Sequence, residues 1–310
     1  MTPRLSIVIP VYNRALLVQR ALASCIGQHF SDWECIVVDD ASTDGTFDAV
    51  QTVADPRIRL ERHATNAGQC VARNTGAQFA RADWVVFLDS DDALEDGALD
   101  IVAKRVASAP ATVGRMFFAC RWDNGVISPD PPFDGTEQGY EGWVRWLELM
   151  HNRPLEAISV VRRSAFLEVP YPDRRTHEGG HNLDFMKRFN FIGYPDVVRR
   201  YHLDANNRMM DTVRDVESML DAAPGLSWLA DTVLRDHSEA LKRWAPSVYR
   251  DYLRTSGLYH LLAGSRQHGF GMTLRAWMDR PLDIRAAALL ACAWMPPRSL
   301  ARVKMRLNAR

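Results

Sequence analysis

The chain has 310 residues, of which 47% are hydrophobic and 25% charged, with 38 basic and 38 acidic side chains. This composition is typical of a globular protein and excludes an intrinsically disordered chain, a collagen and a small disulfide scaffold. Because no stretch approaches the ~20 continuous apolar residues of a membrane span, and Pro10 interrupts the N-terminal apolar run, we expect a cytoplasmic protein. The five cysteines are scattered without a CxxC pair, which predicts reduced core thiols.

The zero net charge conceals an asymmetry along the chain. Residues 271–310, here called the basic C-terminal segment, carry eight Arg or Lys against two Asp, a balance of +6, so residues 1–270 carry −6. Such a segment indicates an anionic partner. Within it, the ten apolar residues 286–295 are too few to span a bilayer and suit an interfacial helix, which favours peripheral contact with an anionic membrane. A helix packed on the protein with a solvated basic face is the alternative, and nucleic acid finds little support.

The first hundred residues alternate between two hydrophobic periodicities. Short β-branched runs predict strands at 5–9, 34–38, 57–62 and 84–88, and helical spacing predicts helices over 16–28, 46–53, 68–81 and 97–107. This alternation is typical of βαβ units in a parallel sheet with flanking helices, whose ligands bind at the carboxyl ends of the strands.

The pattern changes twice in the rest of the chain. Prolines mark loops between 110 and 133, followed by a mixed region with helices at 140–150 and 181–191 and strands at 155–161 and 197–201. Everything beyond 206 has helical spacing, with helices over 212–220, 228–244, 249–262 and 285–293. We therefore expect an α/β domain over 1–205 and a helical region over 206–310.

The ends of the first two predicted strands carry groups suited to a nucleotide. After the first strand comes Pro10, with Tyr12 offering a ring on which a base could stack, although an ordinary loop capped by Asn13 explains the same residues. The second strand ends in Asp39 and Asp40, two adjacent carboxylates that repel one another unless a hydrogen-bond donor or a cation lies beside them.

Two later segments add cationic and metal-binding groups. Gly68 permits close backbone approach at a helix start, and Arg73 follows within two turns, placed for a phosphate or an acidic loop; a solvated arginine is the alternative. The fourth strand ends in Asp89, Ser90 and Asp91, and Asp-x-Asp can bring two carboxylates onto one hard cation, Mg²⁺ or Mn²⁺, that bridges to a diphosphate. A helix-capping loop is the alternative explanation.

These stretches together resemble family 2 glycosyltransferases, the inverting nucleotide-sugar enzymes of the GT-A fold. The matching motifs are IVIPVYNR at 7–14, IVVDDASTDGT at 36–46, NAGQCVARNTG at 66–76 and WVVFLDSDD at 84–92. The resemblance implies a nucleotide-sugar half over 1–108 and an acceptor half over 109–205. It also implies a nucleotide-sugar site with Asp40 on the base and Asp89 on the ribose. The implied site residues are Pro10, Tyr12, Asn13, Arg14, Asp39, Asp40, Asn66, Arg73, Asp89 and Ser90.

The resemblance further implies a cation ligated by Asp91, with Asp89 and His202 as further candidates. The acceptor half departs from the family pattern, because Asn182 stands where many relatives carry the acid that deprotonates the acceptor, and an amide cannot take a proton. Glu178 is our first candidate for that base, followed by Asp184 and His181.

The sequence therefore predicts an inverting, metal-dependent glycosyltransferase that uses a nucleoside-diphosphate sugar, with UDP as the first choice of nucleotide. The acceptor would be a hydroxyl of a saccharide or lipid-linked saccharide in cell-surface polysaccharide synthesis. Two alternatives stay open: a non-catalytic nucleotide-sugar-binding assembly protein, which Asn182 would suit, and a sugar nucleotidyltransferase, whose glycine-rich phosphate loop is missing after the first strand.

Overall fold

The computed structural model describes residues 2–153, 155–174, 178–204 and 215–308, and the chain divides into two compact units. The α/β unit comprises residues 1–143 and 152–205, and the helical unit comprises 144–151 and 206–310. The predicted domain boundary at 205/206 and the start of the helix predicted at 212–220 lie outside the described residues.

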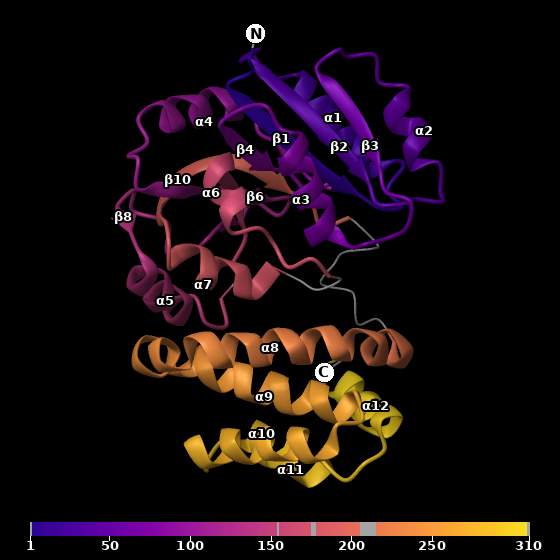
Figure 1. Ribbon diagram of the computed structural model, residues 1–310, viewed down its shortest axis with the longest axis vertical. Coiled ribbons are helices and arrows are strands. Elements are labelled where there is room, and N and C mark those ends of the chain that lie inside the picture. The colour runs from indigo at the N-terminus through magenta and orange to yellow at the C-terminus, as the bar shows by residue number, and fades with distance from the viewer. Residues whose placement is uncertain (1, 154, 175–177, 205–214, 309–310) are drawn as a thin grey trace. The chain divides into compact units, whose positions relative to one another are not determined.

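A single sheet forms the centre of the α/β unit (Figure 1). Its strand order is β3-β2-β1-β4-β9-β6-β10-β5. The four strands predicted in the first hundred residues are present as β1 (Leu5–Val11), β2 (Trp33–Asp39), β3 (Ile58–Arg62) and β4 (Trp84–Phe87). They are mutually parallel, with β1 paired to both β2 and β4. Alternate residues of β1 enter two different cores, Ile7 and Ile9 on one face and Val8 on the other, which explains why the strand is apolar throughout.

The second half of the sheet mixes strand directions. β9 (Ala157–Arg162) runs antiparallel to both β4 and β6 (Val113–Trp122), and β10 (Asn190–Tyr201) runs parallel to β6. β6 is a buried ten-residue strand where the sequence predicted loops. That prediction was wrong because the prolines flank the apolar run instead of interrupting it. Short strands complete the sheet: β5 (Ala93–Leu94), β7 (Ile127–Ser128) and β8 (Glu137–Gln138).

Helices connect and flank these strands. The four helices predicted in the first hundred residues are confirmed as α1 (Leu17–Ile26), α2 (Thr46–Gln51), α3 (Gln69–Phe79) and α4 (Ala98–Ala107). Further along the chain lie α5 (Tyr140–Leu149), α6 (Arg163–Glu168), a 3₁₀ turn (Glu178–Gly180) and α7 (His181–Met186). α7 is five residues shorter than predicted because the chain enters β10 at Asn190, not at residue 197.

The helical unit contains α8 (Val216–Trp244), α9 (Pro246–Leu262), α10 (Arg266–Asp279), α11 (Ile284–Cys292) and α12 (Pro297–Asn308). The sequence predicted two helices in place of α8, but the helix continues through Pro224. Within the residues described, none of the helices combines the length and apolar character that crossing a bilayer requires.

Candidate active site

The topology gathers the polar strand ends at one edge of the sheet. β1, β2, β4, β6 and β10 all point the same way, so their carboxyl ends meet there, and the antiparallel β9 begins at the same edge. Asp89 follows β4, Arg199 lies near the end of β10, and Glu156 precedes β9. Groups more than a hundred residues apart in sequence therefore share one site.

Asp89 lies at the centre of this site and is surrounded by donors. Its Oδ1 accepts hydrogen bonds from Arg73 Nη2 at 2.6 Å and from Gln69 Nε2 at 2.9 Å, and its Oδ2 lies 3.3 Å from Arg199 Nη1. Burial alone would raise the pKa of the Asp89 carboxyl, but the positive charges of Arg73 and Arg199 outweigh it and lower this pKa. Asp89 is thus held as a carboxylate.

Arg199 is a buried guanidinium that joins three carboxylates. Beside Asp89, it lies 2.7 Å from Glu156 Oε2 and 3.5 Å from Asp92 Oδ2. Burial raises the pKa of Asp92 to about 7, with Arg199 opposing the rise and the Asp89 charge adding to it. Neither Arg199 nor Glu156 was singled out from the sequence. The signal available was a charged residue within or beside an otherwise apolar strand, which is costly to bury without a partner.

Asp91, the predicted metal ligand, forms an ion pair with Arg14: Arg14 Nη1 lies 2.6 Å from Asp91 Oδ2. The Asp91 backbone carbonyl accepts a hydrogen bond from Arg20. The first and fourth motifs, 77 residues apart, therefore meet through one carboxylate. Neighbouring Ser90 is buried at the same strand end.

The loops after β1 and β2 are tied together by hydrogen bonds. Asn13 adopts a left-handed backbone conformation, φ 51°, and its Oδ1 accepts from the Thr43 N–H at 2.8 Å while its own N–H donates to Ser42 Oγ at 2.9 Å. Asp39 is fully buried and accepts from the Ser42 N–H at 3.0 Å. Pro10 is buried near the end of β1, and Tyr12, between Pro10 and this crosslink, is 41% exposed. Its predicted stacking on a base stays a prediction.

Asp40 has partners that the sequence did not indicate. One oxygen accepts from the Ala67 N–H at 2.8 Å and lies 2.7 Å from His63 Nδ1, and the other accepts from the Gly68 N–H at 2.7 Å. Asn66 Nδ2 lies 3.3 Å from the Asp40 carbonyl. The carboxylate thus anchors the chain entering α3, and its predicted contact with a nucleobase stays a prediction.

Arg73 connects Asp89, in the fourth motif, with Glu178, which lies in the segment where the sequence predicted the base. Its Nη2 holds Asp89 and its Nη1 forms an ion pair with Glu178, from the 3₁₀ turn before α7. Burial would lower the pKa of this guanidinium, but the two carboxylates reverse the effect and raise it. The side chain of Glu178 is 41% exposed, so it combines a fixed position with access to a ligand.

The remaining acceptor-side candidates differ in environment. His181 is buried, and its Nε2 donates to the Val169 carbonyl at 2.7 Å; burial, reinforced by the Arg115 charge, places its pKa well below the usual value. Asn182 Oδ1 accepts from the same buried Arg115, another residue that sequence reasoning did not single out. Asp184 is half-buried on α7, where its charge contributes to the raised pKa of Tyr140.

Asp89 and Asp91 are the carboxylates of the predicted cation site, and in this structure each is paired with an arginine. Hard oxygen ligands fit Mg²⁺ or Mn²⁺, which proteins bind through one or two carboxylates while substrate phosphates complete the shell. His202 lies 2.9 Å from Asp123 through its Nδ1, and its backbone N–H donates to Asp92 Oδ1 at 3.0 Å. Its predicted role as a metal ligand stays a prediction.

Solved structures support the predicted fold. The structure aligns with that of S. aureus TarS in complex with UDP-GlcNAc, with a TM-score of 0.61 and 18% identity. The alignment covers 97% of this chain and 90% of the TarS chain. A mannosyltransferase from Pyrobaculum calidifontis, in complex with GDP-Man and Mn²⁺, gives a TM-score of 0.54 at 20% identity and covers 100% of this chain and 89% of that one. The predicted GT-A fold with a helical C-terminal region is therefore confirmed.

The chain has sequence relatives among bacterial glycosyltransferases. A GalNAc(5)-diNAcBac-PP-undecaprenol beta-1,3-glucosyltransferase from Campylobacter jejuni is 36% identical over 114 residues, which are 36% of this chain and 37% of that protein. The chain spans about a third of the length of the first curated relatives it matches. The model of glycosyl transferase family 2 matches residues 6–166, more than half of the chain and all four motifs at the sheet edge. The chain therefore belongs to glycosyl transferase family 2.

Proposed function

We propose that this protein transfers one sugar from a nucleoside-diphosphate sugar, with UDP as the first choice of nucleotide, to a hydroxyl of a saccharide or lipid-linked saccharide in cell-surface polysaccharide synthesis. The observation that carries the proposal is the double contact of Arg73, which joins Asp89 after β4 to Glu178 of the acceptor segment. One buried cation thereby fixes a donor-side and an acceptor-side carboxylate next to each other. The Campylobacter relative, named for transfer to an undecaprenol-linked saccharide, supports the acceptor class.

The donor would bind across residues 1–108. Tyr12 would stack on the base, Asp89 would accept from the ribose, and the Asn13–Thr43 crosslink would fix the loop beneath the nucleoside. Arg14 would leave Asp91 for the diphosphate, because a doubly charged diphosphate competes well for a guanidinium. The ion pair seen between Arg14 and Asp91 would thus be exchanged for two contacts with the ligand.

A divalent cation, Mn²⁺ or Mg²⁺, would be held by Asp91 with Asp89 beside it, and when bound it would supply Lewis-acid stabilisation of the leaving diphosphate. The chain's own contribution is to position these carboxylates and to keep Asp89 ionised. Arg73 and Arg199 hold the pKa of Asp89 low, so that this carboxylate is available as an oxygen ligand at neutral pH. The Mn²⁺ in the Pyrobaculum mannosyltransferase structure supports a divalent cation in this fold.

Acceptor binding is assigned to residues 109–205, with Glu178 as the general base. Inversion by single displacement requires a base that takes the proton of the acceptor hydroxyl as the bond to the anomeric carbon forms. Glu178 is exposed enough to reach a hydroxyl, whereas His181 donates to Val169 and is buried. Asp184 remains the second candidate. No covalent enzyme intermediate is needed.

Contact with an anionic membrane is proposed for the basic C-terminal segment. In the helical unit, Ile284 on α11 is 81% exposed and Trp294 beyond it is 77% exposed. Such large apolar side chains beside arginines suit the interface of an anionic bilayer, where apolar burial and headgroup attraction add. This contact would place the protein at the membrane surface, where a lipid-linked acceptor is found.

Calorimetric titration of UDP, GDP and dTDP, each with and without Mn²⁺, tests the donor half. We expect one nucleotide to bind the wild-type chain in a Mn²⁺-dependent manner and this dependence to disappear in Asp91→Ala. Asp100→Ala, which removes an exposed carboxylate from α4, is the control that should bind like wild type. Absence of binding by all three nucleotides would contradict the proposed function, and binding without turnover on any acceptor would favour the non-catalytic alternative.

A further inference from the structure

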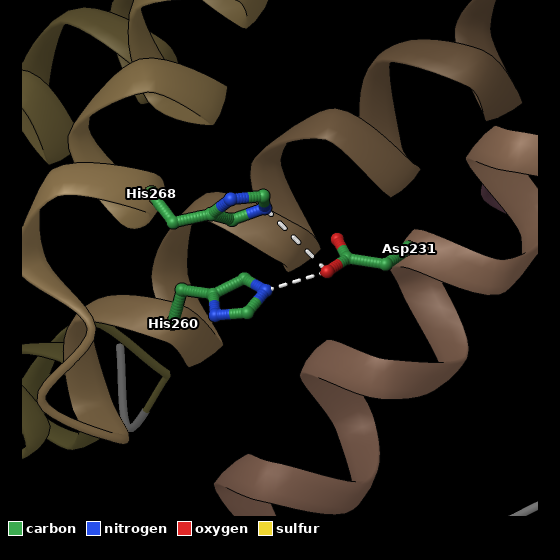
Figure 2. A group of neighbouring side chains, drawn as sticks. All are labelled: Asp231, His260 and His268. Carbon is green, nitrogen blue, oxygen red and sulfur yellow. Dashed lines mark hydrogen bonds and ion pairs between the residues drawn. The ribbon is translucent and has the colours of Figure 1, made fainter.

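We infer that the helical unit contains a transition-metal site, of the zinc class, formed by Asp231, His260 and His268. The three side chains come from α8, α9 and α10 respectively and converge on one point (Figure 2). Two imidazole nitrogens and one carboxylate oxygen lie within 4.8 Å of one another. Among the residues that the structure describes, this is the one group of three such ligands that meets this spacing.

One of the two distances to Asp231 has the spacing of a tetrahedral site, and the other is that of a hydrogen-bonded ion pair. Figure 2 shows both histidines facing the same carboxylate oxygen, with His260 Nε2 at 2.7 Å and His268 Nε2 at 3.5 Å from Asp231 Oδ2. With zinc–ligand bonds of about 2.0–2.1 Å, ligand atoms of a tetrahedral site are about 3.3 Å apart. The His268 spacing already matches, and the His260 contact, now a hydrogen bond, would lengthen by about 0.6 Å when an ion replaces the shared proton.

The packing of α9 against α10 explains why the two rings meet. A Cβ at Gly269 would lie 2.8 Å from the Leu261 backbone nitrogen and 2.9 Å from the Gly257 carbonyl, so glycine is required for the two helices to approach this closely. His268 directly precedes Gly269, and His260 lies one turn after Gly257. The two imidazole centroids are consequently 4.2 Å apart, with the rings tilted by 57°.

The carboxylate is oriented by a partner of its own. Ser256 is fully buried, and its hydroxyl donates to Asp231 Oδ1 at 2.5 Å. This hydrogen bond orients the carboxylate so that Oδ2 faces the histidines, and outer-shell partners orient metal-bound carboxylates in the same way. His268 is 53% exposed, so an ion has access from solvent.

The donor set selects the class of metal. Two imidazoles and one carboxylate suit Zn²⁺ and related borderline ions, whereas the carboxylates at the sheet edge suit Mg²⁺ or Mn²⁺. Three protein ligands leave the fourth position for water. Because the ligands lie on three helices, the ion would cross-link α8, α9 and α10 and stabilise the helical unit. This inference is independent of the proposed transferase activity.

Titration of Zn²⁺ into the chelator-treated full-length chain tests the site, with calorimetry and thermal unfolding as readouts. The variant is His268→Gln, which changes an exposed side chain, and the matched control is His29→Gln, an exposed histidine of the α/β unit. We expect wild type and His29→Gln each to bind one equivalent of Zn²⁺ more than His268→Gln does. Zn²⁺ should also raise the unfolding temperature of wild type and of His29→Gln, but not that of His268→Gln. Ser256→Ala should weaken Zn²⁺ binding by about 10- to 100-fold.

Equal stoichiometry and affinity in wild type, His268→Gln and His29→Gln would overturn the inference. So would a zinc equivalent lost in Asp91→Ala and retained in His268→Gln, because the ion would then lie at the sheet edge. Far-ultraviolet circular dichroism of each variant, without metal, verifies that the helices are intact and that a change in binding reports the ligand itself.

Discussion

Replacing Glu178 by glutamine removes the proposed general base and keeps a hydrogen-bond acceptor for Arg73 at the sheet edge. Loss of a general base lowers turnover by about 10²- to 10⁴-fold, which corresponds to about 2.7 to 5.4 kcal/mol in the activation free energy. The amide still accepts a hydrogen bond from Arg73, and Arg73 keeps its 2.6 Å contact with Asp89. Because the Glu178 side chain is 41% exposed and buried Arg73 keeps Asp89 as a second carboxylate partner, the variant should remain folded.

The assay is transfer from sugars carried on the nucleotide that titration identifies, measured as kcat and KM together with nucleotide affinity and thermal unfolding. Glu168→Gln is the matched control, because Glu168 is an exposed glutamate of the same unit that pairs with Arg188 at 2.6 Å. We expect Glu178→Gln to bind donor normally and lose kcat, while Glu168→Gln retains both. Near-normal kcat in Glu178→Gln, together with loss of turnover in Asp184→Asn, would refute the reasoning and assign the base to Asp184.

Three further predictions concern stability and surface binding. Asp40→Asn should lower the free energy of unfolding by about 1–3 kcal/mol, measured by chemical denaturation, because an amide leaves one of the backbone N–H groups at the start of α3 without an acceptor. Burial and the Arg115 guanidinium hold the pKa of His181 in the folded chain well below its usual 6.5. Just below pH 6.5, therefore, the unfolded chain takes up a proton at His181 and the folded chain does not. His181 therefore lowers wild-type stability as pH drops below about 6.5, by at most ~1.4 kcal/mol per pH unit. Because Asp92, with a pKa of about 7, acts in the opposite direction in both proteins, the measured quantity is the difference in unfolding free energy between wild type and His181→Gln, which should shift against wild type as the pH falls. The double variant Ile284→Ser/Trp294→Ser should co-sediment less with anionic liposomes than wild type. The control Leu16→Ser, which removes an 83% exposed leucine of the α/β unit, should bind like wild type. Equal binding of wild type and both variants would count against the membrane contact.

Local sequence was sufficient for the first half of the sheet. β1, β2 and β4 are short apolar runs buried on both faces, and α1, α3 and α4 carry the apolar spacing of helices, so each element is specified by its own residues. β6 was not predicted, because its apolar run lies in a proline-rich stretch and is stabilised by β9 and β10, which are distant in sequence. The sequence likewise predicted two helices where α8 is one continuous helix that runs through Pro224.

The motifs identified the acidic residues that gather at the sheet edge, since acidic groups at the ends of buried strands are visible in a linear sequence. What the sequence left open was which partner each charge would have. The contacts of Arg199 with Asp89 and Glu156 join β10, β4 and β9, and the contact of Arg73 with Glu178 spans 105 positions. Coulombic pairing depends on distance in space, and only the order and direction of the strands set those distances.

The composition, the periodicity of the first hundred residues and the four motifs therefore determined the fold class, the family and the edge of the sheet where the polar strand ends meet. Only the tertiary structure decided that Asp40 anchors α3, that Glu178 is held by Arg73, and that Asp231, His260 and His268 converge. The physical reason is that strand and helix formation follow from neighbouring residues, whereas ion pairs and metal sites require side chains from separate elements to meet within a few ångströms.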